Sequence, residues 1–333
     1  MTVNLTIIGL GRIGASLARR LVAQPQLRLA GYDRDPEVAR EAQRQGLVHK
    51  AHLNLARAVE EADLALLSGP LAEQHENLRI IAPELRAGSV AAAIGPLLAP
   101  PLAWAAEMMA NRADRHFVAC HPALNPAQLH SGEAGFEAAS ADLFEQGLWA
   151  LAPAPGCSPE ALRLVAELVR MLGAFPYFVD PSEHDGLAAA TEALPALLAI
   201  ALMQAAAASP GWSEARKVAD RSLSTATAAL LDADPAALRA NRENTLHYLD
   251  AALAELQALR QHLAAGEAAA VDEALAQAAD RRAAWLTERR RGDWEHLGQA
   301  EVNLPTSGEM LGRLLVGGLL IKRGEDPQKG EPG

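Results

Sequence analysis

The chain has few cysteines, few aromatic residues and no excess of basic residues. Its 333 residues include two cysteines, Cys120 and Cys157, and 4% aromatic residues. Two cysteines provide neither a disulfide framework nor the spacing of a metal site, so we expect no bound metal and a reducing, cytoplasmic location. Lysine and arginine number 30 against 41 acidic residues, a formal net charge of −11. This balance argues against nucleic acid and anionic membranes as main partners and favours a small molecule.

We also expect neither a secretory leader nor a membrane-spanning helix. The first apolar strand follows Met1 without a charged leader, so we expect no signal peptide. The most apolar stretch, residues 187–208, is interrupted by Glu192 and Pro195, and its alanine-rich composition predicts a core helix. With 50% hydrophobic and 21% charged residues, the chain is typical of a folded protein with room for two domains.

A glycine-rich turn directly follows the first expected strand, residues 6–8. The turn reads Gly9-Leu10-Gly11-Arg12-Ile13-Gly14. A helical stretch (15–22) and a second strand (27–32) come next. This order is the dinucleotide-binding fingerprint in its structural context: the first glycine permits a tight turn, the second lets a pyrophosphate approach, and the third lets the helix pack closely. FAD, another nucleotide, or a glycine turn without a ligand remain alternatives.

Two residues after the second strand bear on the choice of cofactor. Asp33 lies 19 residues after Gly14, where a carboxylate can accept hydrogen bonds from both ribose hydroxyls and repel a 2′-phosphate. Arg34 can stack on adenine or meet a 2′-phosphate, and it can equally be a solvated side chain. We therefore expect NAD or NADP, with NAD slightly favoured.

The alternation of helix and strand continues through the first half of the chain. Helices are predicted at 36–45 and 56–62, and strands at 64–68, 89–94, 117–120 and 148–152. This pattern predicts an α/β fold, in which an N-terminal doubly wound Rossmann-type sheet is followed by an all-α C-terminal domain. Ligands of such sheets bind outside the carboxyl ends of the strands, so residues there join those of the glycine turn as candidate cofactor-binding residues. These residues are Ser68, Gly69, Pro70 and Gly95.

From residue 180 the strand patterns stop and alanine- and leucine-rich helical patterns take over. Ser182 and Asp185 are candidate caps of a helix through residue 208, Asp234 begins one that runs to about 262, and another covers 267–290. We expect a dinucleotide-binding domain at 1–179 and a helical substrate and dimerisation domain at 180–292. A C-terminal extension at 293–333 is expected to have a disordered end. The apolar helices predict a homodimer formed through the helical domain.

His121 is the candidate catalytic residue among ten histidines. It follows a buried strand and precedes Pro122, at the edge where the cofactor is expected. A histidine there can take the proton of a substrate hydroxyl as hydride leaves for a nicotinamide. The alternative is a histidine that ends the strand and bonds only to backbone.

Several segments together resemble the prephenate and arogenate dehydrogenases of tyrosine biosynthesis. Residues 9–17 are similar to that family's G-L-G-L-I-G-G-S-L, 116–122 to its H-F-V-G-G-H-P and 135–145 to its G-x-E-A-A-x-x-x-L-F-E. Residues 180–185 resemble its D-P-x-E-H-D, and 241–244 resemble an N-R-E-x stretch of its helical domain. The resemblance covers about the first 265 residues in the same order.

The resemblance implies oxidative decarboxylation of a cyclohexadienyl substrate, prephenate or arogenate. Hydride would pass to NAD or NADP while His121 takes the proton of the ring hydroxyl, and loss of carbon dioxide would make the ring aromatic. The resemblance also implies cationic groups that bind the substrate carboxylates.

The chain departs from the family in this substrate-binding half. The family's G-S-V-K is replaced by residues 95–98, Gly-Pro-Leu-Leu, and its S-H-L-P-H by residues 192–196, in which Glu192 replaces a polar residue and both histidines are absent. Arg221 is the nearest candidate for a carboxylate-binding arginine, with Lys217 weaker, although a surface ion pair is the alternative. A dehydrogenase of another small hydroxy acid or imine, or a non-catalytic dinucleotide-binding protein, therefore remain alternatives.

Overall fold

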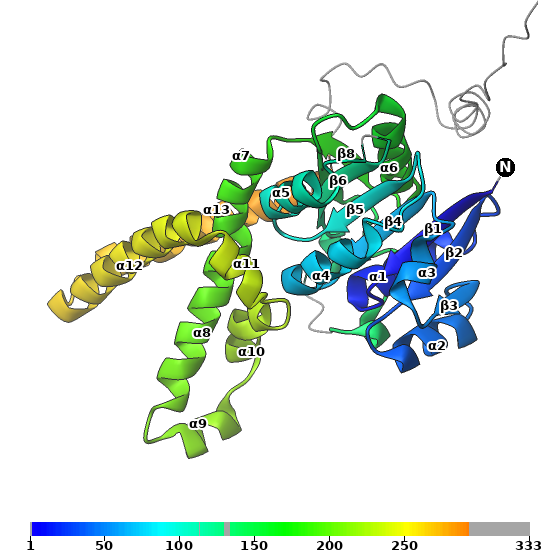
Figure 1. The fold of residues 1–333 in the computed structure, drawn as a ribbon. Coiled ribbons are helices and arrows are strands. Elements are labelled where there is room, and N and C mark those ends of the chain that lie inside the picture. Colours follow the sequence, from blue (N-terminus) through cyan, green and yellow to red (C-terminus); the bar gives the residue numbers. More distant parts are fainter. Residues whose placement is uncertain (1, 113, 130–133, 293–333) are drawn as a thin grey trace, which may run out of the picture.

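The structure, a computed structural model, describes residues 2–112, 114–129 and 134–292. It consists of an eight-stranded sheet with flanking helices, followed by a region that is helical throughout its described residues (Figure 1). The strands are β1 (Val3–Ile8), β2 (Leu27–Tyr32), β3 (Lys50–His52), β4 (Leu64–Ser68), β5 (Val90–Ile94), β6 (His116–Ala123), β7 (Leu148–Pro153) and β8 (Phe175–Phe178). The helices around the sheet are α1 (Arg12–Leu21), α2 (Pro36–Arg44), α3 (Leu55–Val59), α4 (Leu71–Ile81), α5 (Ala99–Met108) and α6 (Pro159–Met171). The predicted extension at 293–333 lies outside the described residues.

The helical region contains long helices joined by shorter ones. It begins with α7 (Pro181–Ala188), which continues through a π-helical turn, η3 (Ala189–Ala193), into α8 (Leu194–Ala207). The remaining helices are α9 (Trp212–Val218), α10 (Arg221–Thr227), α11 (Pro235–Ala240), α12 (Arg242–Ala265) and α13 (Ala268–Arg291).

The strand order in the sheet is β3-β2-β1-β4-β5-β6-β7-β8. Neighbouring strands from β3 to β6 are parallel, β7 is antiparallel to β6, and β8 is parallel to β7. The chain moves outward from β1 through β2 to β3 and then crosses back to β4, so the order reverses between β1 and β4. This arrangement confirms the predicted doubly wound sheet and places its ligand crevice at the carboxyl ends of those two strands.

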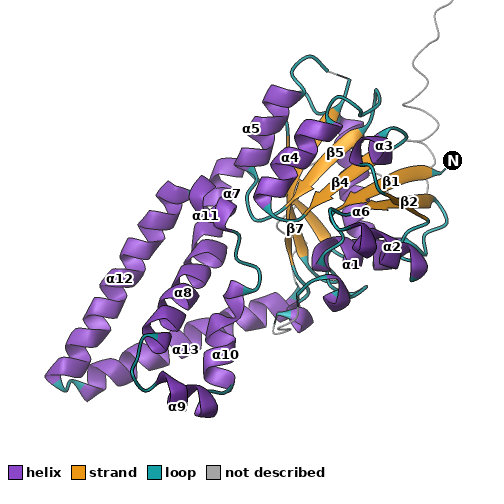
Figure 2. Ribbon diagram, turned by 60° about the horizontal axis from the view of Figure 1, so that its bottom comes forward, coloured by secondary structure: helices purple, strands orange, loops and turns teal. Residues whose placement is uncertain are grey.

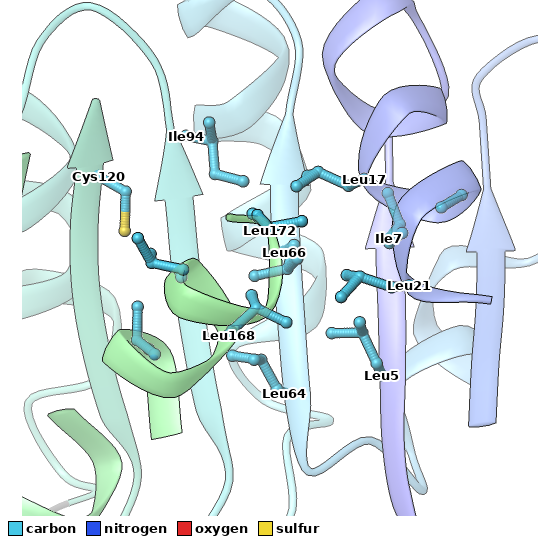
Figure 3. Packing of buried hydrophobic residues seen from close by; sticks show 14 of the residues in the cluster. Leu5, Ile7, Leu17, Leu21, Leu64, Leu66, Ile94, Cys120, Leu168 and Leu172 are labelled. Atoms are coloured by element: carbon cyan, nitrogen blue, oxygen red, sulfur yellow. The ribbon is translucent and has the colours of Figure 1, made fainter. Parts of the chain in front are cut away.

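Helices cover both faces of the sheet because alternate strand residues point to opposite sides. In β4, Leu64 and Leu66 belong to the hydrophobic cluster that contains residues of α1 and α6, whereas Leu67 belongs to the one built with α3, α4 and α5. Figure 3 shows the first cluster, in which Leu17 of α1 and Leu168 of α6 lie over the strands. The two clusters hold the strand ends in fixed positions.

Four helices begin in the same way, with a polar N-cap residue followed by proline. In each case the cap side chain accepts a backbone N–H of the first turn, and the proline fixes the helical φ without removing a needed donor. The cap residues are Asp35, Ser158, Asp180 and Asp234.

Two expectations about helix starts are corrected by these caps. Asp180 accepts N–H bonds from Ser182 and Glu183, so the predicted caps Ser182 and Asp185 are wrong. Asp185 lies inside α7 instead. The single helix predicted from Asp234 to about 262 is two helices, since α11 ends before Asn241 and α12 begins after it.

The predicted core helix at 187–208 is also wrong for the described chain. Only Ala196 and Ala199 of α8 are buried, whereas Leu198, Ile200 and Leu202 are each 38–39% exposed. Figure 2 shows α8 and α12 extending away from the sheet. The helical stretch Pro181–Ala207 contains an 18-residue window with a mean hydropathy of 1.8, and its length and composition alone would allow it to cross a membrane. Apolar composition alone does not determine whether a helix is covered by the rest of its own chain.

Candidate cofactor and catalytic site

The glycine turn after β1 packs so closely that two of its glycines leave no room for a side chain. Gly9 has φ +88°, and a Cβ there would lie 1.8 Å from the carbonyl oxygen of Ser68 at the end of β4. A Cβ on Gly14 would lie 1.8 Å from the carbonyl oxygen of Gly9. The turn is therefore held against the carboxyl end of β4, and α1 is held against the turn.

Gly11 differs from these two glycines because the space beside it is open. Among the described residues, no heavy atom lies within 4 Å of a Cβ built on Gly11. Gly11 is also the N-cap of α1, and no side chain caps that helix end. A helix N-terminus with open space in front of it suits the pyrophosphate of a dinucleotide, through backbone N–H groups and the positive end of the helix dipole. The residues present therefore fit such a cofactor.

The remaining residues of the turn have mainly structural side chains. Leu10 is fully buried, and Ile13 packs against the same hydrophobic cluster. Arg12 is half-buried at the first residue of α1. Of these predicted cofactor-binding residues, Leu10 can thus meet a cofactor only through its backbone, whereas the side chain of Ile13 is partly exposed.

Asp33 lies against the glycine turn. Its Oδ2 accepts the N–H of Leu10 at 2.7 Å and its Oδ1 accepts the N–H of Asp35 at 2.9 Å. Each carboxylate oxygen can accept a further hydrogen bond, so ribose hydroxyls can still bind there. The neighbouring Arg34 has an 82% exposed side chain whose guanidinium lies 3.3 Å from a carboxylate oxygen of Glu73. An exposed pair of this kind is weak, which leaves Arg34 free to turn toward a ligand.

The carboxyl ends of β4 and β5 are joined by a glutamine that the sequence did not single out. Nε2 of the buried Gln74 donates to the carbonyl oxygen of Gly69 at 2.7 Å and to that of Ile94 at 2.8 Å. Gly95 follows directly, and a Cβ there would lie 3.1 Å from Nε2 of Gln74. The predicted crevice residues Ser68, Gly69 and Gly95, with Pro70 as N-cap of α4, are therefore set in one rigid edge.

His121 lies near the carboxyl end of β6, inside the strand. The predicted strand ended at Cys120, but β6 continues to Ala123 because the antiparallel β7 pairs with it, His121 opposite Ala150. Burial, and secondly the electrostatic effect of the neighbouring His184 ring, lower the pKa of His121 well below the ordinary histidine value, and Asp185 opposes that shift only in part. His121 is therefore neutral at pH 7, which is the form that can accept a proton.

A second histidine contacts His121 from the helical region. Nε2 of His184 lies 3.0 Å from Nδ1 of His121, and the two rings are perpendicular with centroids 5.0 Å apart. On its other side, Nδ1 of His184 lies 3.1 Å from Oδ1 of Asp185. Both His184 and Asp185 are buried, being 9% and 5% exposed. We call these three residues the histidine row. His184 lies in the 180–185 motif, which was the sequence signal available for it.

A cavity of about 130 Å³ adjoins the histidine row. It is lined by residues that follow β5, by η3 and the start of α8, and by the segment before α12. Asn241 connects the two sites, since it lines the cavity and its Nδ2 donates to the backbone oxygen of Asp185 at 2.6 Å.

The charge of this cavity is negative. Glu192, Asp232 and Asp234 line it, and its described lining residues include no lysine, arginine or histidine. Burial and the nearby Asp232 raise the pKa of Glu192 to about 7. The candidate substrate-binding residue Arg221 is not part of the lining and is exposed at the start of α10, while Lys217 pairs with Glu214 at 2.8 Å. The structure does not bring either basic residue into the cavity.

Comparisons with known proteins agree on one group of relatives. Residues 17–177 match the family described as prephenate dehydrogenase, nucleotide-binding domain. The chain is 27% identical over 201 residues to the cyclohexadienyl dehydrogenase of Zymomonas mobilis. That alignment covers 60% of this chain and 66% of the relative, just under two thirds of its length.

Solved structures with similar folds come from the same group. The arogenate dehydrogenase of Synechocystis has a TM-score of 0.64 and 21% identity, over 85% of this chain and 99% of that one. The prephenate dehydrogenase of Aquifex aeolicus, in complex with hydroxyphenyl propionate and NAD+, has a TM-score of 0.68 and 19% identity, over 85% and 98%. These likenesses establish the fold, including the helical region after the sheet.

The different surroundings of the glycines predict different effects of alanine. Gly11→Ala should change the free energy of unfolding by less than about 1 kcal/mol, because its methyl meets open space. It should nevertheless weaken NAD binding at least tenfold, because the methyl occupies the space in front of α1. Gly14→Ala, the matched control, should destabilise the protein by about 1–3 kcal/mol through the clash with Gly9. Urea denaturation and isothermal titration calorimetry measure both quantities, and unchanged NAD binding by Gly11→Ala would rule out this end of α1 as the pyrophosphate site.

Proposed function

We propose that this chain is an NAD(P)-dependent dehydrogenase of the prephenate dehydrogenase family that oxidatively decarboxylates a cyclohexadienyl substrate, prephenate or arogenate. The match of residues 17–177 to that family's nucleotide-binding domain supports the proposal. The observation that carries the proposal is the position of His121. A half-buried, neutral histidine lies at the same edge of the sheet as the N-terminus of α1, and it is contacted by a second histidine. This edge supplies a proton acceptor beside a dinucleotide site.

The roles of the chain's own residues follow from this arrangement. Residues 1–179 would bind the dinucleotide, through the turn at Gly11 and the carboxylate of Asp33, and residues 180–292 would complete the substrate site. When bound, the nicotinamide supplies the hydride acceptor. Nε2 of His121 would take the proton of the ring hydroxyl, while its Nδ1 remains against His184.

The negative cavity supports one of the two substrates over the other. Prephenate and arogenate each carry two carboxylates, and arogenate has an ammonium group where prephenate has the keto group of the side chain. Glu192 and Asp232 would attract that ammonium group and have no comparable partner in the keto group. We therefore assign arogenate as the better substrate. The same charge supports, as a second candidate function, a dehydrogenase for another small amine or imine substrate.

Turnover with purified protein tests this function. With NAD or NADP present, we expect reduced nicotinamide to form with arogenate and more slowly with prephenate. His121→Asn should lower kcat by about 10²- to 10⁴-fold, the usual contribution of a general base, with nearly unchanged cofactor affinity. The experiment measures absorbance of the reduced cofactor, with Kd for the cofactor determined separately.

Three outcomes would contradict parts of the proposal. Equal turnover by His121→Asn would remove His121 as the base, and faster turnover of prephenate would remove the assignment to arogenate. Cofactor binding by a folded protein that oxidises neither substrate would favour the second candidate function or a non-catalytic dinucleotide-binding protein.

The cofactor preference depends on the charge of Asp33. We propose NAD as the preferred cofactor, because a carboxylate beside the glycine turn repels a 2′-phosphate. Asp33→Asn keeps an oxygen that can accept the N–H of Leu10 but removes the charge. The ratio of Kd for NADP to Kd for NAD should therefore fall about tenfold, the size expected for one screened charge pair. An unchanged ratio in calorimetry would show that Asp33 does not select the cofactor.

The exposed apolar helices support a homodimer formed through the helical domain. Leu198 and Ile200 of α8, Leu253 and Leu256 of α12, and Trp285 of α13 are 38–52% exposed. Because Asp185, on the same helical stretch as α8, bonds to α5, that stretch is seated on the nucleotide-binding part of the chain. A second copy is therefore the surface that we propose covers these side chains. The cytoplasmic location remains a prediction.

A charge placed on this surface should separate the two copies. Wild-type protein should have the mass of two chains in light scattering after size exclusion, and Leu198→Glu should have the mass of one while it stays folded by circular dichroism. Leu53→Glu is the matched control, because Leu53 is 57% exposed in the nucleotide-binding domain, far along the chain from α8. A monomeric wild-type protein, or a dimeric Leu198→Glu, would exclude this interface.

A further inference from the structure

The 180–185 motif contributes to the site through its last two residues, which the proposed reaction leaves without a role. His184 and Asp185 are buried at the start of the helical region. His184 contacts His121 on one side and Asp185 on the other. The inference below concerns their effect on His121 and rests on the proposed function for its catalytic consequence, though not for its structural one.

The protonation of the histidine row can be derived from the surroundings of Asp185. Its Oδ1 accepts the N–H of Leu98 at 2.8 Å, and its Oδ2 accepts the N–H of Ala99 at 3.0 Å. Two backbone donors at the N-terminus of a helix stabilise the ionised carboxylate, which can only accept hydrogen bonds. The group that faces Oδ1 from His184 is therefore a donor, and Nδ1 of His184 carries a proton.

A neutral His184 with its proton on Nδ1 has an acceptor at Nε2. That nitrogen lies 3.0 Å from Nδ1 of His121, so Nδ1 of His121 must be the donor of this bond. A neutral His121 then has its lone pair on Nε2. His121 thus donates to His184, and His184 donates to Asp185. The direction of both bonds is set by the carboxylate of Asp185, which accepts two N–H groups at the start of α5.

We propose that His184 and Asp185 are positioning residues that hold His121 in the tautomer with a proton on Nδ1 and a free lone pair on Nε2. In the reaction the substrate O–H bond breaks, its proton moves to Nε2 of His121, and the electron pair of that bond stays on oxygen. The Nδ1 proton stays in its bond to His184. The positive charge formed on His121 is stabilised by the acceptor at His184 and, through it, by the carboxylate of Asp185.

A different protonation of the same two histidines would contradict this proposal. A doubly protonated His184 would donate from Nε2 to Nδ1 of His121, and a neutral His121 would then carry its proton on Nε2. Such a His121 could not accept the substrate proton. The two arrangements place the same heavy atoms at the same distances, and they differ in which nitrogen of His121 is protonated.

Nitrogen NMR of the full-length protein labelled with ¹⁵N-histidine distinguishes the two arrangements without any substrate. Spectra at pH 7.5, with His121→Asn and His184→Gln used for assignment among the ten histidines, report the proton on each ring nitrogen. We expect His121 protonated at Nδ1 and bare at Nε2, and His184 protonated at Nδ1. A proton on Nε2 of neutral His121 would overturn the proposal.

Variants at His184 test the catalytic consequence. His184→Leu removes the acceptor, so kcat should fall about 10- to 100-fold with the KM for substrate and the Kd for cofactor within about twofold. His184→Gln restores an acceptor oxygen near the position of Nε2 and should recover at least tenfold over His184→Leu. Glu183→Gln, at the exposed neighbouring residue, is the control for changes in α7 alone.

The outcomes separate this proposal from the proposed function. Equal kcat for His184→Leu and wild type, or no recovery by His184→Gln, would contradict the positioning role. If the wild-type protein oxidises neither substrate but shows the expected tautomer, the proposed function fails while the effect of His184 on His121 stands. If His184→Leu unfolds, the tautomer in the wild-type protein and in His184→Gln still decides the question.

Discussion

The carboxylate of Asp185 is the interaction on which the site depends. It accepts the N–H groups of Leu98 and Ala99, which start α5 directly after β5, and so attaches α7 to the carboxyl edge of the sheet. A negative charge at a helix N-terminus is stabilised by the helix dipole, and here both partners are shielded from water. Because His184 precedes Asp185 in α7, the contact that seats the helix also seats His184 against His121. The attachment of α7 to the edge of the sheet and the position of His184 against His121 therefore depend on the same contact.

A second carboxylate from the helical region caps a helix of the sheet in the same way. Oδ2 of Asp234 accepts the N–H of Leu71 at the start of α4 at 2.6 Å, while its Oδ1 accepts the N–H of Ala236 in its own helix. The N-termini of α4 and α5 are thus occupied by carboxylates of the chain itself. At the same edge, α1 begins at Gly11 with no side-chain cap and open space beside it. Carboxylates of the chain thus occupy two helix ends at this edge, whereas the N-terminus of α1 has no side-chain cap and is where we propose that the cofactor phosphates bind.

Local patterns predicted most of the fold, and contacts distant in sequence account for what they missed. The glycine spacing and the alternation of strands and helices predicted the doubly wound sheet, because each is set by residues within one turn or strand. His184 lies 63 residues from His121, and no spacing rule joins residues so far apart. Gln74 similarly acts between two strand ends, Gly69 and Ile94. The exposure of α8 could not be foreseen because hydrophobicity states that a face is to be covered and does not state by which chain.

The negative cavity illustrates that proteins with the same fold can differ in the side chains that line the corresponding cavity. A basic side chain at position 192 would attract a substrate carboxylate, and a neutral one would not repel it. Glu192 beside Asp232 would repel such a carboxylate, and this repulsion is stronger in a partly buried cavity than in water. Burial, and secondly the nearby carboxylate of Asp232, raise the pKa of Glu192 to about 7. An ammonium group relieves the repulsion between the two carboxyl groups, and a further carboxylate increases it. The histidine row, anchored at Asp185 on the opposite side of Asn241, is untouched by this exchange. The proposed proton transfer and the proposed substrate preference therefore rest on separate sets of contacts, and a substitution at Glu192 need not disturb the contact between His121 and His184.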